Sequence, residues 1–255
     1  MLSQKRVLFT AKYSVIEPLF ALHLLGSVRD HGHEGTFLPI KKYDFEPLYK
    51  RVEQFGATDV GMNVYSGNHI PFFKAADELR KRGVKVHIGG PHATYFAKTC
   101  GQHADLVYKG QSFDSFAAYL NDDVENFTRN SILNKTHQQL LAMAITSRRN
   151  ELGLQKNELL PKAELTHIES AMEEKIAELA KNPVHQRAIS DALISRTLFK
   201  DTLSDTFPKP DRATFYRDNP DMADNPIKNA ICGEGCPFAC TYCYNVAWNS
   251  PEMYG

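Results

Sequence analysis

Three of the five cysteines in this 255-residue sequence lie within eight residues near its end, at Cys236, Cys240 and Cys243. Zinc in proteins usually takes four tetrahedral ligands, drawn from two separated C-x2-C pairs. Cys232 could supply a fourth thiolate, but all four would then lie on one tight loop rather than on two knuckles. Three thiolates on one loop suit a [4Fe–4S] cluster, because each binds one iron and the fourth iron keeps an open site. The spacing therefore favours an iron–sulfur site over zinc.

The residues around these cysteines suit a loop that a ligand approaches closely. Tyr242, directly before the third cysteine, places an aromatic face beside whatever binds the open iron. Pro237 stiffens the loop, and Gly235 leaves room for close backbone approach. The stretch GCPFACTYCYN, with the pattern C-x3-C-x-aromatic-C after a predicted strand, resembles the signature of the radical S-adenosylmethionine (SAM) superfamily.

This resemblance implies both cofactors and a reaction type. It implies that the three cysteines hold the cluster, that the amino and carboxylate groups of SAM chelate the open iron, and that Tyr242 lies near the adenine. One electron, from a donor such as flavodoxin or ferredoxin, then cleaves SAM reductively and initiates radical chemistry. Cys100 and Cys232 have no place in the motif, and we expect both to be ordinary buried thiols.

The first 120 residues alternate strand and helix patterns. Short apolar runs bounded by turn residues predict five strands, at residues 6–10, 36–40, 59–66, 84–90 and 105–110. Strands that alternate with helices of about ten to fifteen residues predict right-handed βαβ units. We therefore expect an α/β domain over residues 1–125, with a Rossmann-like (flavodoxin-like) parallel five-stranded sheet flanked by helices.

The rest of the sequence changes character twice. Residues 126–205 carry helical patterns and predict a helical linker or insertion. Its clearest helix has an apolar stripe made by Leu165, Ile168, Met172, Ile176 and Leu179. Residues 207–226, rich in Pro and Asp, predict an extended connector, and residues 227–235 predict a strand leading into the cysteine loop. Residues 206–255 would then be the start of a radical SAM (β/α) barrel.

The N-terminal sheet carries a resemblance of its own. Ligands of such sheets bind beyond the carboxyl ends of the strands. DVGMNVYSGN, VKVHIGGPHATYF and ADLVYKGQSFDSF resemble, in order and spacing, the cobalamin (B12)-binding domain of one class of radical SAM enzymes. The last loop has Gly-Gln where that family usually has Gly-Glu. The resemblance implies a cobalamin pocket lined by Tyr65, Ser66, Gly67, Gly89, Gly90, Pro91, His92, Gly110 and Gln111.

No histidine is expected to ligate cobalt. The first βα loop, residues 11–17, contains none, and in DHGHEG Gly32 stands where the cobalamin-mutase motif D-x-H-x-x-G has histidine. We therefore expect His31 and His33 to be surface turn residues, and any cobalamin to be bound without a protein histidine. His92, and more weakly His69, are placed to touch a ligand; for His92 the alternative is a cap at the strand end.

The composition indicates which partners and which cell compartment to expect. The sequence is 42% hydrophobic and 24% charged, with 30 basic and 30 acidic residues, so no global field draws it to nucleic acid or an anionic membrane. It has no apolar run of about 18 residues and no signal-peptide pattern at its start, so we expect a cytoplasmic protein. Thiols stay reduced there, which favours metal ligation over disulfides.

The leading hypothesis is a B12-dependent radical SAM enzyme that transfers a methyl group to an unactivated carbon of a small-molecule or peptide substrate. A barrel needs several further βα units to enclose SAM, so we expect this chain to be a fragment without turnover by itself. The alternatives are a radical SAM cyclase or rearrangement enzyme, a cobalamin- or metal-binding module without catalysis, and a methylthiotransferase-like protein. The last would carry three cysteines in its first domain, where residues 1–150 here contain only Cys100.

Overall fold

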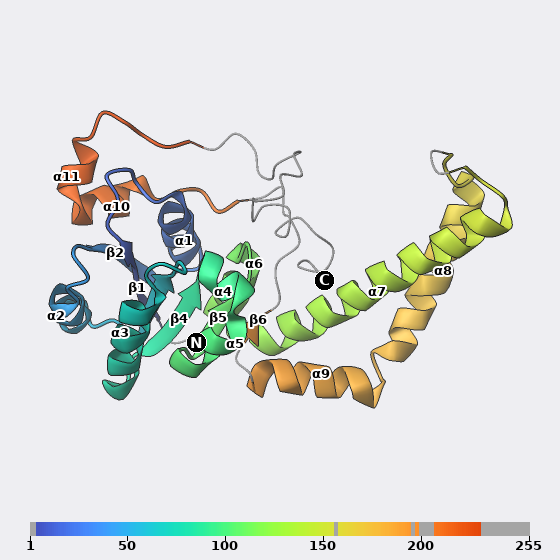
Figure 1. Cartoon of the computed structure of the whole chain (residues 1–255), viewed down its shortest axis with the longest axis horizontal. Helices are drawn as coiled ribbons and strands as arrows, with labels where there is room; N and C mark the ends of the chain where they lie inside the picture. The colour runs from blue at the N-terminus through green and yellow to red at the C-terminus, as the bar shows by residue number, and fades with distance from the viewer. Residues whose placement is uncertain (1–3, 156–157, 195–196, 199–206, 231–255) are drawn as a thin grey trace. The chain divides into compact units, whose positions relative to one another are not determined.

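The computed structural model describes residues 4–155, 158–194, 197–198 and 207–230, and it shows an α/β protein (Figure 1). The chain divides into two compact units: residues 1–124 together with 195–255 form the α/β unit, and residues 125–194 form the helical unit. A parallel sheet flanked by helices is what the alternating pattern predicts, and it is confirmed. Within the described ranges, none of the helices combines the length and the apolar character that crossing a membrane requires.

The described part of the sheet has six parallel strands in the order β2-β1-β3-β4-β5-β6. They are β1 (Arg6–Lys12), β2 (Glu34–Ile40), β3 (Asp59–Asn63), β4 (Lys85–Gly89), β5 (Leu106–Tyr108) and β6 (Thr197–Leu198). All five strands expected in the first 120 residues are present. The sixth corrects the purely helical prediction for residues 126–205; a two-residue strand is too short to leave a periodic pattern in the sequence.

Helices cover both faces of the sheet. On one face Val60, Val86 and Ile88 pack with α2 and α3, and on the other Val7 and Phe9 pack with α1 and α6. Burial on both faces explains why these strands read as continuous apolar runs rather than as alternating ones. The helices of this part are α1 (Leu19–Asp30), α2 (Glu46–Phe55), α3 (His69–Lys81), α4 (Pro91–Tyr95), α5 (Ala97–His103) and α6 (Phe113–Leu120).

Helices α4 and α5 were not predicted, since the sequence pattern indicated only a turn after β4. Pro91 stands at the first position of α4, where its fixed φ suits a helix and its missing N–H is not needed. Each helix is only a few residues long, so no apolar period develops along it. Cys100 on α5 is fully buried, as expected, and burial raises the pKa of its thiol to about 11.

Residues 207–226 are not the extended connector that their composition predicted. They form α10 (Arg212–Asp218), which packs beside α1 and β2, and α11 (Pro220–Ala223), which packs on α10 (Figure 1). The Phe215 and Phe37 rings are buried with centroids 5.2 Å apart, and Asp211 caps α10 by accepting from the Thr214 N–H. Gly26 permits this docking, because a Cβ there would lie 1.9 Å from the Lys209 carbonyl oxygen.

The described start of the predicted barrel domain therefore belongs to the core of the α/β unit. The sequence missed this because Pro and Asp are as typical of helix starts as of extended chain. The strand expected at residues 227–235 lies mostly outside the described residues, and residues 227–230 are not in a strand.

The helical unit confirms the helical prediction for this stretch of the chain. It contains α7 (Val124–Glu151), α8 (Lys162–Leu179) and α9 (Pro183–Ile194). Arg148 on α7 makes a two-pronged ion pair with Glu164 on α8, with Nε–Oε2 and Nη2–Oε1 distances of 2.9 and 3.0 Å. The predicted apolar stripe lies on α8 and is half-buried.

Candidate functional site

The parallel ladders bring the ends of β3 and β4 together at the carboxyl edge of the sheet. Asn63, the last residue of β3, is in register with Gly89, the last residue of β4, and the Val64 N–H donates to the Gly89 carbonyl at 3.0 Å. β1 lies between β2 and β3, so the connections after β1 and β3 leave the sheet in different directions. A crevice for ligands forms at such a switch in strand order.

Gly90 allows the chain after β4 to pass directly over the end of β3. Its φ is +95°, and a Cβ on it would lie 2.1 Å from the Asn63 Oδ1 and 3.0 Å from the Val64 nitrogen. Both the backbone conformation and the contact therefore exclude a side chain. The position predicted from sequence as a cobalamin contact is thus also a steric requirement of the edge.

Hydrogen bonds tie the loops after β3, β4 and β5 into one surface. The Thr94 hydroxyl accepts from the Gly110 N–H at 2.9 Å and donates to the Gly90 carbonyl at 3.1 Å. A hydrogen bond of 3.0 Å joins Ser66 Oγ to His92 Nδ1. The predicted site residues of three separate loops are therefore neighbours, although Thr94, which links two of these loops, was not among them.

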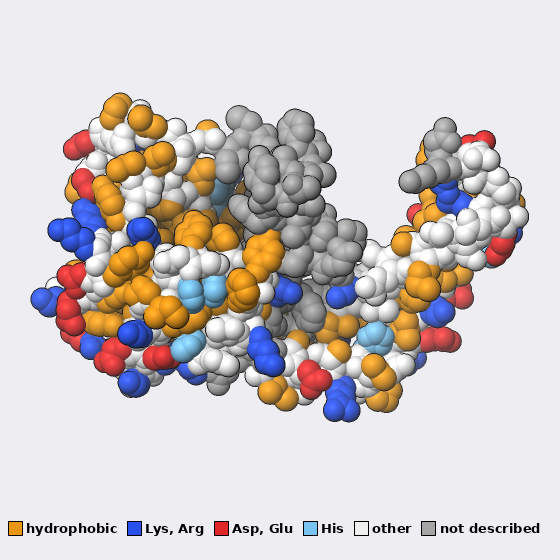
Figure 2. Space-filling model, viewed as in Figure 1, with side chains coloured by type: hydrophobic (Ala, Val, Ile, Leu, Met, Phe, Trp, Pro, Cys, Tyr) orange, Lys and Arg blue, Asp and Glu red, His pale blue; other side chains and the backbone are white. Residues whose placement is uncertain are grey.

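Aromatic rings form a wall beside this surface. The His92 ring stacks on His69, with centroids 4.3 Å apart, and on Phe96 at 4.8 Å. Figure 2 shows hydrophobic side chains gathered around histidines over α3 and α4. Burial, together with the neighbouring His69, lowers the pKa of His92. His92 is therefore a neutral imidazole at neutral pH, a group that binds by hydrogen bonds and stacking rather than by charge.

Three residues at this edge have buried polar atoms without a hydrogen-bond partner among the described residues: Asn63 Oδ1, His92 Nε2, and both amide atoms of Gln111. Asn63 and His92 are only 8% and 6% exposed. Leaving such an atom unpaired costs about 1–3 kcal/mol, so each one calls for an explanation. Of the seven described residues with an atom of this kind, three gather at this edge, which marks it as a place for a ligand.

The exposed large apolar side chains of the α/β unit also gather at this edge. Among its described residues, six of them follow a strand end: Val15, Ile16, Tyr43, Tyr65, Ile70 and Phe96. Two more lie beside these connections, because Phe207 packs on Phe113 at the start of α6 and Ile227 follows Asn225, which donates to the Val15 carbonyl. An apolar rim around unpaired polar atoms is typical of a ligand site.

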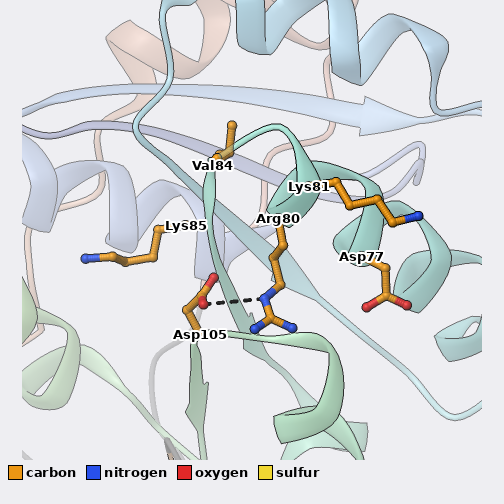
Figure 3. A pocket seen from close by; sticks show the side chains of 7 residues that line it. Asp77, Arg80, Lys81, Val84, Lys85 and Asp105 are labelled. Atoms are coloured by element: carbon orange, nitrogen blue, oxygen red, sulfur yellow. Dashed lines mark ion pairs between the residues drawn. The ribbon is translucent and has the colours of Figure 1, made fainter.

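The opposite, amino edge of the sheet carries a shallow depression of about 670 Å³ between the end of α3 and the starts of β4 and β5 (Figure 3). Arg80 pairs with Asp105 across it, with an Nε–Oδ1 distance of 3.4 Å, and also donates to the Gln102 carbonyl. Lys81 and Lys85 extend away from this pair on opposite sides. Its central charges already have partners, so we assign no ligand to it.

A buried polar network also lies toward the amino edge. The Asp59 carboxylate accepts from His87 Nε2 at 2.9 Å, from the Tyr119 hydroxyl at 2.5 Å and from the Thr58 hydroxyl at 2.5 Å. Burial opposes ionisation of Asp59, but the hydrogen bonds and the His87 ring outweigh it and lower the pKa of this carboxyl to about 2. Burial and the Asp59 carboxylate raise the pKa of Tyr119. The network is fully paired and enclosed, as structural networks are.

His31 and His33 lie in the turn between α1 and β2, as expected, but both are half-buried rather than on the surface. His31 Nδ1 lies 2.7 Å from the Ser27 carbonyl oxygen and caps the end of α1. His33 is joined through Nε2 to the Leu120 carbonyl and through Nδ1 to the Lys5 N–H.

The cysteine motif lies outside the described residues. This applies to Cys236, Cys240, Cys243 and Tyr242, and also to Cys232. In the part of the chain that the structure describes, no three His, Cys, Asp or Glu side chains are grouped so as to hold a metal. No protein-family model matches the chain, and neither a curated protein nor a solved structure matches it.

Besides Thr94, sequence reasoning missed two further residues, Asn63 and Glu17. Asn63 sits at the end of a strand that reads as wholly buried, and only its amide, unusual in such a run, could have signalled a polar contact. Glu17 lies in the first βα loop and is 4% exposed, yet its partners are about 200 residues away, so no local pattern reveals it.

Proposed function

We propose that this chain belongs to the cobalamin-dependent radical SAM enzymes and takes part in methyl transfer to an unactivated carbon. The observation that carries the proposal is the spacing of Cys236, Cys240 and Cys243. Its donor chemistry fits the cofactor, because three thiolates on one loop leave one iron of a [4Fe–4S] cluster open to SAM. Structural zinc would need a fourth protein ligand.

The sheet supports the cobalamin half of the proposal. Its first five strands have the order 2-1-3-4-5, which is that of flavodoxin-like domains. Cobalamin is a broad ring edged with carboxamide groups. Such a ligand needs hydrogen-bonding atoms beside an apolar rim, and the carboxyl edge combines unpaired amide and imidazole atoms with exposed apolar side chains.

Each residue of the carboxyl edge would have a role in binding the cofactors. The cluster with SAM would supply the radical, and cobalamin the methyl group. The Asn63 Oδ1 accepts a hydrogen bond from a ligand amide, and the Gln111 amide both donates and accepts. His92 adds its Nε2 and a stacking face, and the Gly90 backbone leaves the ligand space to approach. Tyr242 lies beside the adenine of SAM.

Anaerobic reconstitution tests the cluster. The chain is incubated with iron and sulfide, desalted, and analysed for metal and by absorption. We expect about four irons per chain, which are lost when Cys236, Cys240 and Cys243 are all changed to Ala and kept in the matched Cys232→Ala variant. Stoichiometric zinc without iron would overturn the cluster assignment.

A second measurement tests the sheet. The chain is incubated with hydroxocobalamin, and the cobalamin retained after desalting is read from its absorption band. We expect retention near one per chain, reduced about tenfold by Gln111→Leu and unchanged by Lys81→Ala, which lies at the opposite edge. If no cobalamin is retained, or if both variants retain it equally, the assignment of this edge is wrong.

A further inference from the structure

The Glu17 carboxylate joins the loop after β1 to the chain that leads toward the cysteines. Arg212 on α10 donates to Glu17 Oε1 through Nη2 at 2.9 Å and through Nε at 3.2 Å. The Tyr216 hydroxyl donates to Oε2, and the Asn229 N–H donates to Oε1 at 3.2 Å. We call these four residues, Glu17, Arg212, Tyr216 and Asn229, the Glu17 clasp.

The clasp holds Asn229 through its backbone and its side chain together. Besides the N–H, the Asn229 side-chain amide donates to the Glu17 carbonyl at 3.0 Å, and the Asn229 carbonyl accepts from Arg212 Nη2 at 2.6 Å. The backbone of residue 229 is therefore fixed in position and direction against the loop after β1. In the sequence, Asn229 stands seven residues before Cys236.

Burying a charged side chain costs free energy unless the charge is fully paired by hydrogen bonds and an opposite charge. Glu17 is 4% exposed, and it is paired by a guanidinium, a phenol and a backbone N–H. Burial opposes its ionisation, but the hydrogen bonds from Tyr216 and Arg212 outweigh it and lower the pKa of Glu17. The carboxylate is thus charged at neutral pH, when its bonds to Arg212 are strongest.

The core of the α/β unit does not need this charge to hold residues 207–218. Phe215 is already buried there, and the Asp211 N–H donates to the Leu22 carbonyl at 2.9 Å on α1. Asn229, in contrast, follows α11 as irregular chain, and the clasp is its main attachment among the described contacts. The clasp therefore acts chiefly on the last residues before the cysteine segment.

We propose that Glu17 is a positioning residue: it fixes Asn229, seven residues before Cys236 in the sequence, to the loop after β1 at the carboxyl edge of the sheet. This edge also carries the unpaired atoms of Asn63 and His92. The inference rests on the proposed function only in giving the cysteine segment a cluster to carry. The contact itself is testable without any cofactor.

Amide hydrogen exchange of the chain without metal tests the attachment. Glu17→Gln keeps the shape of the side chain and removes its charge, and Tyr216→Phe removes only one hydroxyl. Arg217→Met is the matched control, because this guanidinium leaves the same helix but, among the described residues, forms its hydrogen bonds with its neighbour Asp218 alone. We expect exchange at residues 224–230 to accelerate about tenfold in Glu17→Gln, less in Tyr216→Phe, and not in Arg217→Met.

A photo-cross-linker separates positioning from simple stabilisation. Placed at the exposed Val15, it should capture residues 224–230 in the native chain and do so about tenfold less in Glu17→Gln, in step with the exchange rates. Unchanged exchange at residues 224–230, an equal acceleration throughout the α/β unit, or undiminished cross-linking would each overturn the proposal. If iron fails to bind while these two results hold, the proposed function is wrong and the clasp stands.

Discussion

The two edges of the sheet differ in how their buried polar groups are paired. Toward the amino edge the Asp59 carboxylate has three side-chain donors, whereas at the carboxyl edge an amide oxygen of Asn63 and a ring nitrogen of His92 have no partner among the described residues. The exposed large apolar side chains of the α/β unit follow the same division. A paired network stabilises the fold by itself, while unpaired atoms in an apolar rim reduce stability until a ligand binds.

The largest effect should come from breaking the paired network. Asp59→Ala leaves the His87 ring and the Tyr119 hydroxyl buried without their acceptor, so we expect it to lower the free energy of unfolding by about 3 kcal/mol. Urea unfolding followed by circular dichroism measures this. Retention of hydroxocobalamin by the folded variant should be unchanged. A loss of stability under about 1 kcal/mol would show that the network is not structural.

Substitutions at two glycines with positive φ, one at each edge, allow the two edges to be compared directly. Gly90 faces Asn63 at the carboxyl edge, while a Cβ on Gly83, whose φ is +79°, would have no described atom within 4 Å at the amino edge. We expect Gly90→Ala to cost about 2–3 kcal/mol, from strain and collision, and to abolish cobalamin retention. Gly83→Ala should cost about 1 kcal/mol from strain alone and leave retention intact. If urea unfolding showed the same loss of free energy for Gly90→Ala and Gly83→Ala, the steric argument would be wrong.

Lowering the pH should reduce the free energy of unfolding through Asp59, near the amino edge of the sheet. The pKa of Asp59 is lowered from 3.8 to about 2 in the folded chain, so its contribution is present above pH 3.8 and is lost as the pH falls toward 2. A shift of this size corresponds to about 2 kcal/mol. Unfolding free energies measured across this window should fall less in Asp59→Asn than in the native chain. Parallel pH profiles would assign the acid sensitivity to other carboxyl groups.

The smallest and most discriminating effect concerns Asn63. Asn63→Leu replaces a buried side chain whose amide oxygen is unpaired by an apolar side chain of similar size, so the free energy of unfolding should stay level or rise by about 1 kcal/mol. The affinity for hydroxocobalamin should nevertheless fall about tenfold, because a hydrogen-bond acceptor is removed. A variant that is both less stable and equally good at binding would mean that Asn63 belongs to the structural network instead.

Much of the fold could be predicted because it depends on local patterns. The alternation of apolar strand runs with amphipathic helices yields all five strands of the first 120 residues, and helix α8 ends where Lys181-Asn182-Pro183 indicates. The small residues of the strand-end loops, Ser66, Gly90 and Gly110 among them, are at the edge where they were expected. The extended connector predicted for residues 207–226 was wrong, since the docking of this segment depends on Gly26 and Phe37, far away in the sequence.

The sequence by itself determined the cysteine spacing, the parallel α/β architecture and which loop residues lie at the carboxyl edge of the sheet, because each depends on residues close together in the chain. Only the tertiary structure decided which polar atoms at that edge are unpaired. It also decided that Glu17 binds Asn229, which lies more than 200 residues further along the sequence. Whether a buried polar atom has a partner depends on every segment packed around it, and those segments come from the whole length of the chain.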